Sequence, residues 1–129
     1  HGDCTFSNLL VDDRNEVWFI DPRGYFGDKQ YFGDRRYDYA KLFYSINGNY
    51  DQFNQRNFTL DLGEEINITI KSNEYEFLSD FMLDICGTDA KEIRILHALI
   101  WISLSGYVRD DYDSILASFF NGLYLLENA

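Results

Sequence analysis

One segment of the sequence limits the possible folds more than any other. Residues 89–105 predict a helix whose apolar side chains lie on nearly every side, with Thr88 as its cap. Such a helix is stable in water only when other elements surround it, so it belongs at the centre of a helical bundle. The side chains expected in this core are those of Ile95, Leu99, Trp101 and Ile102.

Apolar residues at three- and four-residue spacing predict further helices around this one. The first begins after the capping residue Asp34 and ends near Gly48. The second spans residues 74–86 and stops at Gly87, and the last covers about residues 114–126.

Strand-forming runs separated by turn residues predict two short hairpins. One pairs residues 9–11 with residues 17–20 across a polar turn, and the other pairs Phe58–Leu62 with Ile66–Ile70. Residues 22–33 are rich in glycine and aromatic side chains without a period, and we expect an extended loop there. The predicted fold class is therefore α+β and mostly helical.

The size and charge of the chain restrict its partners. Its 129 residues fit one domain, which can bury about two thirds of its unfolded surface. The formal net charge of −11 opposes binding to nucleic acid and to anionic membrane surfaces. The same charge repels ATP, so a nucleotide site must depend on bound cations or on basic groups elsewhere.

Cysteine usage and hydropathy indicate the compartment. Cys4 and Cys86 lie far apart and form no metal-ligand spacing, which favours reduced thiols in a cytoplasmic protein, while a disulfide stays open. No export signal is recognisable, and the longest apolar stretch, residues 96–108, is interrupted by polar residues and Gly106. We expect a cytoplasmic location without a membrane partner.

Residues that can do chemistry flank the first hairpin. His1-Gly2-Asp3 and Asn8 precede it and Asp21 follows it, so pairing of its strands brings both flanks together. An aspartate can orient an attacking hydroxyl and accept its proton, while an amide oxygen and a second carboxylate are ligands that Mg²⁺ prefers. The sequence therefore predicts that Asp3, Asn8 and Asp21 converge on one metal-bridged phosphate.

The order His, Gly, Asp, four residues, Asn resembles the catalytic loop of the aminoglycoside phosphotransferase and choline kinase family. The resemblance continues through Asp21, Gly33-Asp34 and residues 37–42, and so covers about a third of the chain. The sequence IDPRG at residues 20–24 looks closest to the sugar kinase-like and fructosamine kinase-like members.

This resemblance implies the C-terminal lobe of a protein-kinase-like fold, in which short hairpins carry the catalytic and metal-binding loops. Residues 1–34 would form that catalytic segment, and residues 35–129 a helical subdomain on the substrate side. The implied activity is transfer of the γ-phosphate of ATP, with Mg²⁺ as cofactor, to a hydroxyl of a small metabolite such as a sugar or an amino alcohol.

The same resemblance implies roles for single residues. Asp3 would be the catalytic base, and Asn8 and Asp21 would bind Mg²⁺. His1 and Asp38 would hold the loop in shape without taking part in the chemistry.

Several other residues have two interpretations. The Arg23 guanidinium can contact phosphate or an anionic substrate group, or pair with a surface acid. The acidic run at residues 109–113 can attract a cationic substrate or cap the last helix. His97 is expected to be a hydrogen-bonded core residue, and the aromatic residues between Tyr25 and Phe32 can line a substrate loop or pack inside.

The glycine-rich strand loop and the phosphate-gripping lysine of the family's N-terminal lobe have no recognisable counterpart in this sequence. We therefore expect the chain to be part of a longer protein that supplies this lobe, and to have negligible kinase activity alone. Two other functions stay open. One is a non-catalytic kinase-like module that binds or scaffolds another domain, and the other is a metal-dependent phosphate hydrolase, for which further metal ligands are not recognisable.

Overall fold

Helices and 3₁₀ turns hold about half of the 129 residues, all of which, His1–Ala129, are described by the computed structural model. Together with three small hairpins they confirm an α+β fold. The helices are α1 (Arg35–Ile46), α2 (Tyr50–Asn54), α3 (Ser79–Cys86), α4 (Ala90–Leu104) and α5 (Tyr112–Glu127).

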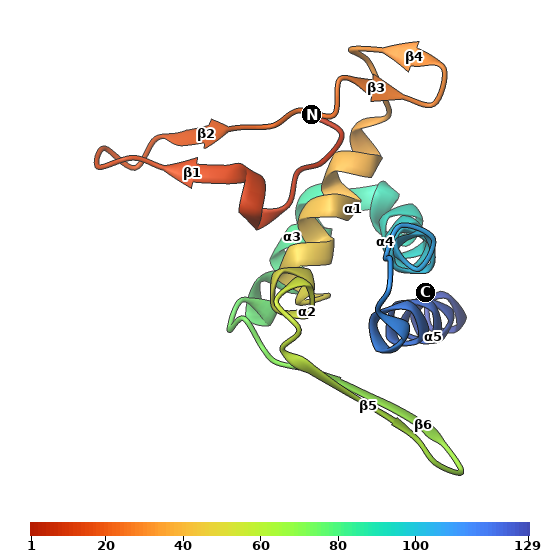
Figure 1. Cartoon of the computed structure of the whole chain (residues 1–129). Helices are drawn as coiled ribbons and strands as arrows, with labels where there is room; N and C mark the ends of the chain where they lie inside the picture. Colours follow the sequence, from red (N-terminus) through yellow and green to blue (C-terminus); the bar gives the residue numbers. More distant parts are fainter.

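Every sheet is a two-stranded antiparallel hairpin, and no strand joins two hairpins into a larger sheet (Figure 1). The first and third hairpins confirm the predicted pairings. The second, which lies within residues 22–33, differs from the predicted loop. It contains only two residue pairs, too few to produce an alternating pattern in the sequence. The strands are β1 (Leu9–Val11), β2 (Val17–Phe19), β3 (Tyr25–Phe26), β4 (Lys29–Gln30), β5 (Phe58–Leu62) and β6 (Ile66–Ile70).

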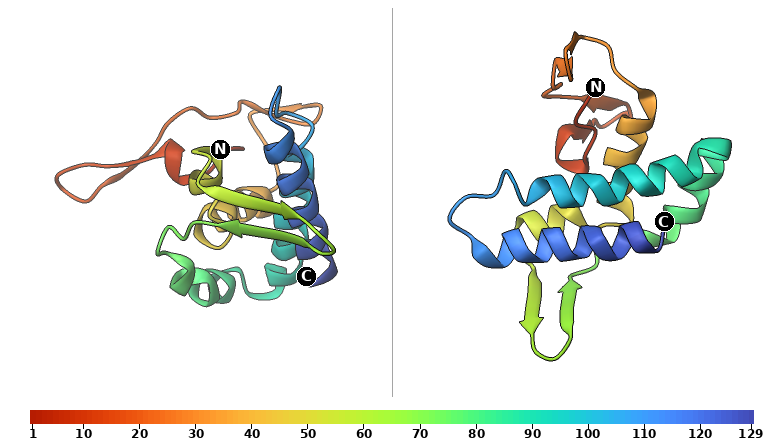
Figure 2. Two further views of the ribbon diagram at one scale, coloured as in Figure 1. Left: turned by 60° about the horizontal axis from the view of Figure 1, so that its bottom comes forward. Right: turned by 90° about the vertical axis from the view of Figure 1, so that its right-hand side faces the viewer.

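Helix α4 packs against α1 and against α5, and so holds the central position that its apolar sequence predicts. Helices α4 and α5 run side by side along most of their length (Figure 2, right). Hairpin β1–β2 projects away from this helical part (Figure 1), whereas β6 contacts α5 and side chains of β5 and β6 pack against the buried cluster. The buried cluster consists of Ala40, Phe43, Tyr44, Ile46, Phe53, Met82, Leu83, Cys86, Ile93, Ile100, Trp101 and Ala117.

The predicted core of α4 is only partly right. Trp101 is fully buried, and Ile95 and Ile102 are half-buried, but Leu99 is 46% exposed. The reason is that α1 and α5 are the main cover of α4, so the strip that carries Leu99 stays in solvent. None of the helices combines the length and the apolar character that a membrane crossing needs.

His97 confirms the prediction of a hydrogen-bonded core histidine. Its Nε2 accepts a hydrogen bond of 3.0 Å from Nε1 of Trp101, one turn later on α4. The side chain is 2% exposed, and its burial lowers the pKa of the imidazole to about 3. The imidazole is therefore uncharged at neutral pH.

The predicted start of α1 after Asp34 is confirmed, because the Asp34 side chain caps this helix by accepting from the Arg36 backbone N–H. The other three predicted starts are wrong by one to five residues, because local hydrogen bonds form other turns first. Helix α3 begins at Ser79 and not at residue 74, since Glu74 has a φ of +69°. Thr88 lies in a 3₁₀ turn and does not cap α4. Helix α5 begins two residues early, because the side chain of Asp111 caps it by accepting from the Ser114 backbone N–H.

At Gly122 the backbone of α5 lies close to α4. A Cβ at this position would lie 2.6 Å from Cγ1 of Ile102 and 2.7 Å from its backbone nitrogen. Alanine stabilises a helix interior by about 1 kcal/mol over glycine, but overpacking against a backbone costs about 1–3 kcal/mol. We therefore expect Gly122→Ala to lower the free energy of unfolding in urea by about 1 kcal/mol.

The matched control is Gly106→Ala, where the nearest atom, the backbone oxygen of Ser103, would be 3.4 Å away. This variant should stay within about 0.5 kcal/mol of the parent chain. A Gly122→Ala chain as stable as the parent would contradict the close helix approach.

Candidate functional site

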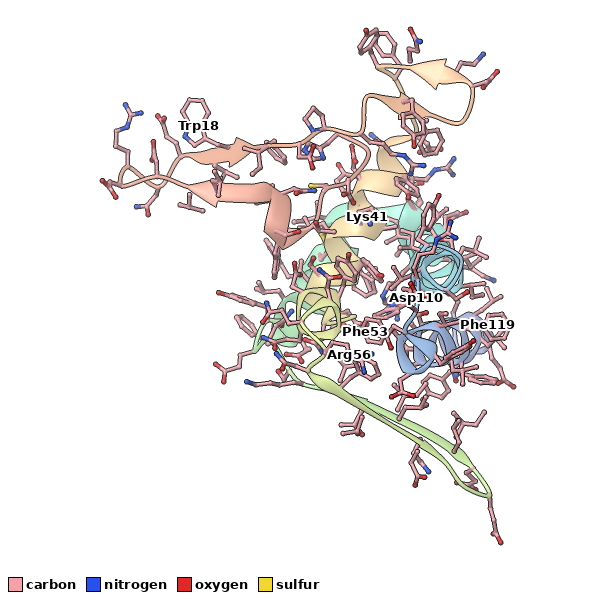
Figure 3. All side chains as sticks on the ribbon, in the orientation of Figure 1. Trp18, Lys41, Phe53, Arg56, Asp110 and Phe119 are labelled. Carbon is pink, nitrogen blue, oxygen red and sulfur yellow. The ribbon has the colours of Figure 1, made fainter.

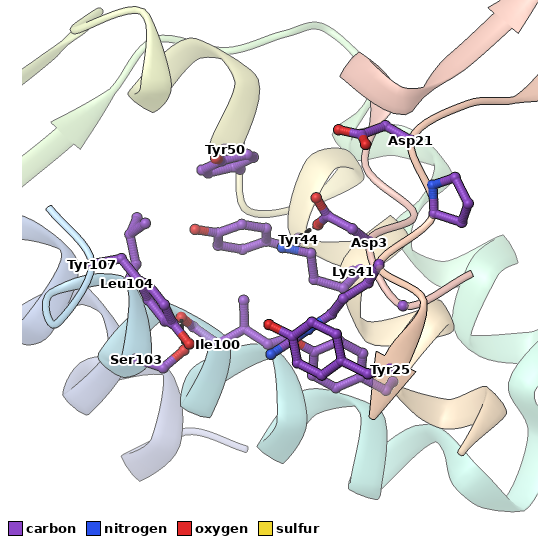
Figure 4. A pocket seen from close by; sticks show the side chains of 14 residues that line it. Asp3, Asp21, Tyr25, Lys41, Tyr44, Tyr50, Ile100, Ser103, Leu104 and Tyr107 are labelled. Atoms are coloured by element: carbon purple, nitrogen blue, oxygen red, sulfur yellow. Dashed lines mark hydrogen bonds and ion pairs between the residues drawn. The ribbon is translucent and has the colours of Figure 1, made fainter. Parts of the chain in front are cut away.

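A cavity of about 400 Å³ lies where the segments that flank hairpin β1–β2 meet helices α1 and α4. Figure 4 shows the Asp3, Asp21 and Lys41 side chains on its wall, together with several tyrosine rings. The cavity is formed by residues far apart in the sequence, which the folding of α1 against the N-terminal segment brings together.

Two neighbours fix the carboxylate of Asp3. Nζ of Lys41, from α1, lies 2.8 Å from Oδ1 of Asp3. Nδ2 of Asn8 donates to Oδ2 of Asp3 at 3.1 Å and to its backbone oxygen at 2.8 Å. The Lys41 side chain is only 13% exposed, so this ion pair is partly shielded from water. The carboxylate is therefore held in one orientation beside a positive charge.

Asp21 reaches the same cavity because the strand pairing continues past β2. The backbone N–H of Ile20 donates to the backbone oxygen of Asn8 at 3.0 Å, so Asp21 follows directly after a residue paired with Asn8. Asp3 and Asp21 both line the cavity, whereas Asn8 lies behind Asp3 and contacts it through its amide. Asp21 is exposed and makes no hydrogen bond or ion pair, so its carboxylate is free to bind a ligand.

His1 and Asp38 hold the N-terminal loop in place. The carboxylate of Asp38 accepts from the backbone nitrogen of His1 at 2.8 Å and from the backbone N–H of Gly2 at 2.6 Å. The His1 ring donates from Nε2 to the Ile20 backbone oxygen at 2.8 Å and accepts at Nδ1 from the Asp3 backbone N–H at 3.2 Å. These contacts tie the segment before β1 to the segment after β2.

Arg23 is held by aromatic side chains and not by a surface acid. Its guanidinium lies 4.7 Å from the ring centroid of Tyr25, and Nη1 donates to the Tyr37 hydroxyl at 3.2 Å. It forms no ion pair. Gly2 has a φ of +82°, and a Cβ there would lie 2.8 Å from Cβ of Arg23. The two loops therefore touch at this point.

The acidic run at residues 109–113 caps the last helix. Asp111 pairs with Arg56 and accepts from the backbone and the hydroxyl of Ser114. Its hydrogen bond with Arg56 is the main reason that the pKa of this carboxyl falls to about 2. The run is not part of the cavity lining, so these contacts give no support to a cationic substrate there.

The sequence patterns did not identify Lys41 as a site residue. One signal was available, because Lys41 follows Asp38 by three residues and so lies on the same face of α1. Tyr44 continues that face after another three residues and also lines the cavity. The direction in which α1 docks against the N-terminal loop decides whether this face meets Asp3, and no local pattern contains that information.

Few protein oxygens at this site are available to a metal ion. No group of three or more His, Cys, Asp or Glu residues is arranged to hold a metal ion by itself. Mg²⁺ at phosphate-transfer sites, however, needs only one or two protein oxygens, because water and phosphate supply the others. The unpaired carboxylate of Asp21 lines the cavity and can supply one such oxygen, whereas Asn8, whose Oδ1 accepts no hydrogen bond, lies outside the cavity lining.

Comparisons of the chain with family models, with curated proteins and with solved structures give no match. The case for any function therefore depends on the contacts within the chain. Among these contacts, the most informative are those of the Asp3 carboxylate, which Lys41 and Asn8 hold in one orientation in the cavity that Asp21 also lines. A carboxylate held in this way can accept a proton from a bound hydroxyl group.

Proposed function

We propose that this chain is the catalytic half of a phosphotransferase that uses ATP and Mg²⁺ to phosphorylate a hydroxyl group of a small molecule. One observation carries the proposal: Asp3, oriented by Lys41 and Asn8, shares a cavity with the unpaired carboxylate of Asp21. The resemblance of the HGD loop to small-molecule kinases agrees with this arrangement.

Each residue has a separate task in the proposed reaction. Asp3 accepts a hydrogen bond from the acceptor hydroxyl and takes its proton as the new oxygen–phosphorus bond forms, while the bond between the γ-phosphorus and the bridging oxygen breaks and ADP leaves. Lys41 orients Asp3 through the 2.8 Å ion pair and places positive charge beside the reacting oxygen. Asn8 and Asp21 hold the metal ion, which offsets charge on the phosphate oxygens when bound.

We propose that the residues that bind the nucleotide belong to an N-terminal lobe in a longer polypeptide. Hairpin β1–β2 supports this, because its apolar side chains are exposed and Trp18 projects away from the helices (Figure 3). Contiguous exposed apolar side chains commonly mark an interaction surface. The exposed side chains are Leu10, Val11, Val17, Trp18, Phe19 and Ile20.

A non-catalytic scaffolding module would also use such a surface, but it would not need the Asp21 carboxylate. An unpaired carboxylate next to a fixed aspartate adds nothing to folding, whereas phosphoryl transfer requires one. We also propose a cytoplasmic location, where ATP is available. The thiols of Cys4 and Cys86 are both buried and unbridged, in agreement with a reducing compartment.

The proposed metal site can be tested on the chain itself with Mn²⁺ as a paramagnetic probe. In NMR spectra, Mn²⁺ should broaden the amide signals of Asn8, Ile20 and Asp21 before others. Asp21→Asn should weaken Mn²⁺ binding by about tenfold or more, because the variant loses the charged ligand.

The control for this test is Asp13→Asn. Asp13 is exposed in the turn of hairpin β1–β2 and makes no hydrogen bond, and its replacement changes the net charge by the same amount. This variant should bind Mn²⁺ like the parent chain. Equal weakening by both replacements, or broadening spread over all surface acids, would refute the metal site.

A further inference from the structure

Tyrosine side chains dominate the wall of the cavity. Five of them line it, together with the hydroxyl of Ser103 (Figure 4). They offer flat apolar ring faces and several hydroxyl groups that can both donate and accept hydrogen bonds. The tyrosines are Tyr25, Tyr37, Tyr44, Tyr50 and Tyr107.

Aromatic walls of this kind often bind ammonium ligands, but here the protein's own cations lie over three of the five tyrosine rings. Nζ of Lys41 lies 5.0 Å from the ring centroid of Tyr44 and 5.6 Å from that of Tyr50. The guanidinium of Arg23 lies over Tyr25. A cationic ligand would be repelled by these groups at the faces that could otherwise attract it.

The cavity also lacks the surplus of negative charge that an amine needs. Among its lining residues, the two acids Asp3 and Asp21 are balanced by the two cations Arg23 and Lys41, although the whole chain carries a net charge of −11. Asp3 is already paired with Lys41. Under the proposed function Asp21 is needed by the metal ion, so no carboxylate remains for an ammonium group.

Tyr44 adds an independent sign of a hydroxylated ligand. Its side chain is 1% exposed, and its hydroxyl is buried without any hydrogen-bond partner. Burial raises the pKa of this phenol well above its usual range, so the group stays protonated and needs an acceptor. Buried polar groups without a partner are uncommon, and at the wall of a cavity a ligand hydroxyl can satisfy this one.

We propose that the acceptor bound in this cavity is an uncharged, polyhydroxylated ring compound of the sugar type, and that the cavity selects against amines. The inference rests on the proposed function, which assigns Asp21 to the metal ion and so leaves it unavailable to an amine. Sugar rings present both apolar C–H faces and hydroxyl groups, which match tyrosine faces and tyrosine hydroxyls respectively. A volume of about 400 Å³ falls within the range of small-molecule sites.

The test is ligand-observed saturation-transfer NMR on the whole chain with three matched pairs of sugars. Glucose, mannose and galactose are each compared with the corresponding 2-amino sugar at about pH 6, where an ordinary amine is protonated. Each neutral sugar should bind about tenfold more tightly than its amino counterpart, because the ammonium group would be desolvated beside Lys41 and Arg23 without a partner.

Tyr44→Phe keeps the ring and removes the hydroxyl, and it should weaken binding of the neutral sugars about three- to tenfold. The control is Tyr124→Phe on α5, which is exposed and outside the cavity and should change nothing. Tighter binding of the amino sugars, no binding of any neutral sugar, or unchanged binding by Tyr44→Phe would overturn the inference. The Mn²⁺ experiment is independent of these outcomes, so the proposed function can survive this failure or fail separately.

Discussion

Replacement of Asp3 by asparagine should lower the turnover number for ATP-dependent phosphorylation by a factor of about 10²–10⁴. An amide has nearly the same shape as a carboxylate, but it cannot take the proton of the acceptor hydroxyl, and it leaves Lys41 without its partner. The measurement is phosphate transfer to a hydroxyl acceptor by a polypeptide that joins this chain to the proposed nucleotide-binding lobe. The KM for ATP should change little, because Asp3 faces the acceptor and not the nucleotide base.

Two comparisons make this experiment specific. Asp80→Asn removes an exposed acid of α3 that has no hydrogen bond, and should leave turnover unchanged. The circular dichroism melting curve of Asp3→Asn should match that of the parent closely enough to exclude unfolding at the assay temperature. Full turnover by Asp3→Asn would remove the assigned base and with it the proposed mechanism.

Acidification from pH 7 to pH 5 should cost the fold about 2 kcal/mol through His97 alone. The buried imidazole has a pKa of about 3, against an ordinary value of 6.5, because its burial penalises the charged form. Between these two values the unfolded chain binds a proton that the folded chain does not, so the free energy of unfolding decreases as the pH falls below 6.5. Urea unfolding at several pH values measures this loss.

His97→Gln is the matched variant, because a glutamine side chain can still accept from Trp101 but does not titrate. It should be less stable than the parent at pH 7, yet its stability should vary little between pH 7 and pH 5. The carboxyls of Asp34 and Asp111 have a pKa of about 2, so their contributions are lost only as the pH falls from 3.8 toward that value, below this window. Equal pH dependence of variant and parent would show that His97 is charged or exposed.

Hydrophobic spacing predicted four of the five helices and missed the short helix α2, and of the predicted starts only that of α1, after its cap Asp34, is right. The beginning of α3 depends on Asn73, whose side chain accepts from the Tyr75 backbone N–H and forms a turn in place of a helix. The exposure of Leu99 has a different origin. Whether a strip of an apolar helix is covered depends on how many neighbours dock against it, which is a property of the tertiary structure.

The part of the candidate site that depends on the pairing of β1 with β2 could be predicted from the sequence. Asp3, Asn8 and Asp21 are near one another because a short hairpin closes between them, and both the hairpin and its flanks are visible in the sequence. Lys41 and Tyr44 were not predicted, because they reach the cavity through the docking of α1. Only the folded chain reveals that these side chains meet Asp3.

Gly2 and Arg23 lie so close together that the Arg23 side chain leaves no room for a side chain at residue 2. A Cβ at residue 2 would lie 2.8 Å from Cβ of Arg23, so in this chain the space beside residue 2 is already occupied. The guanidinium near the cavity comes from the opposite loop. A change at residue 2 to any larger amino acid would therefore displace Arg23 from Tyr25 and Tyr37.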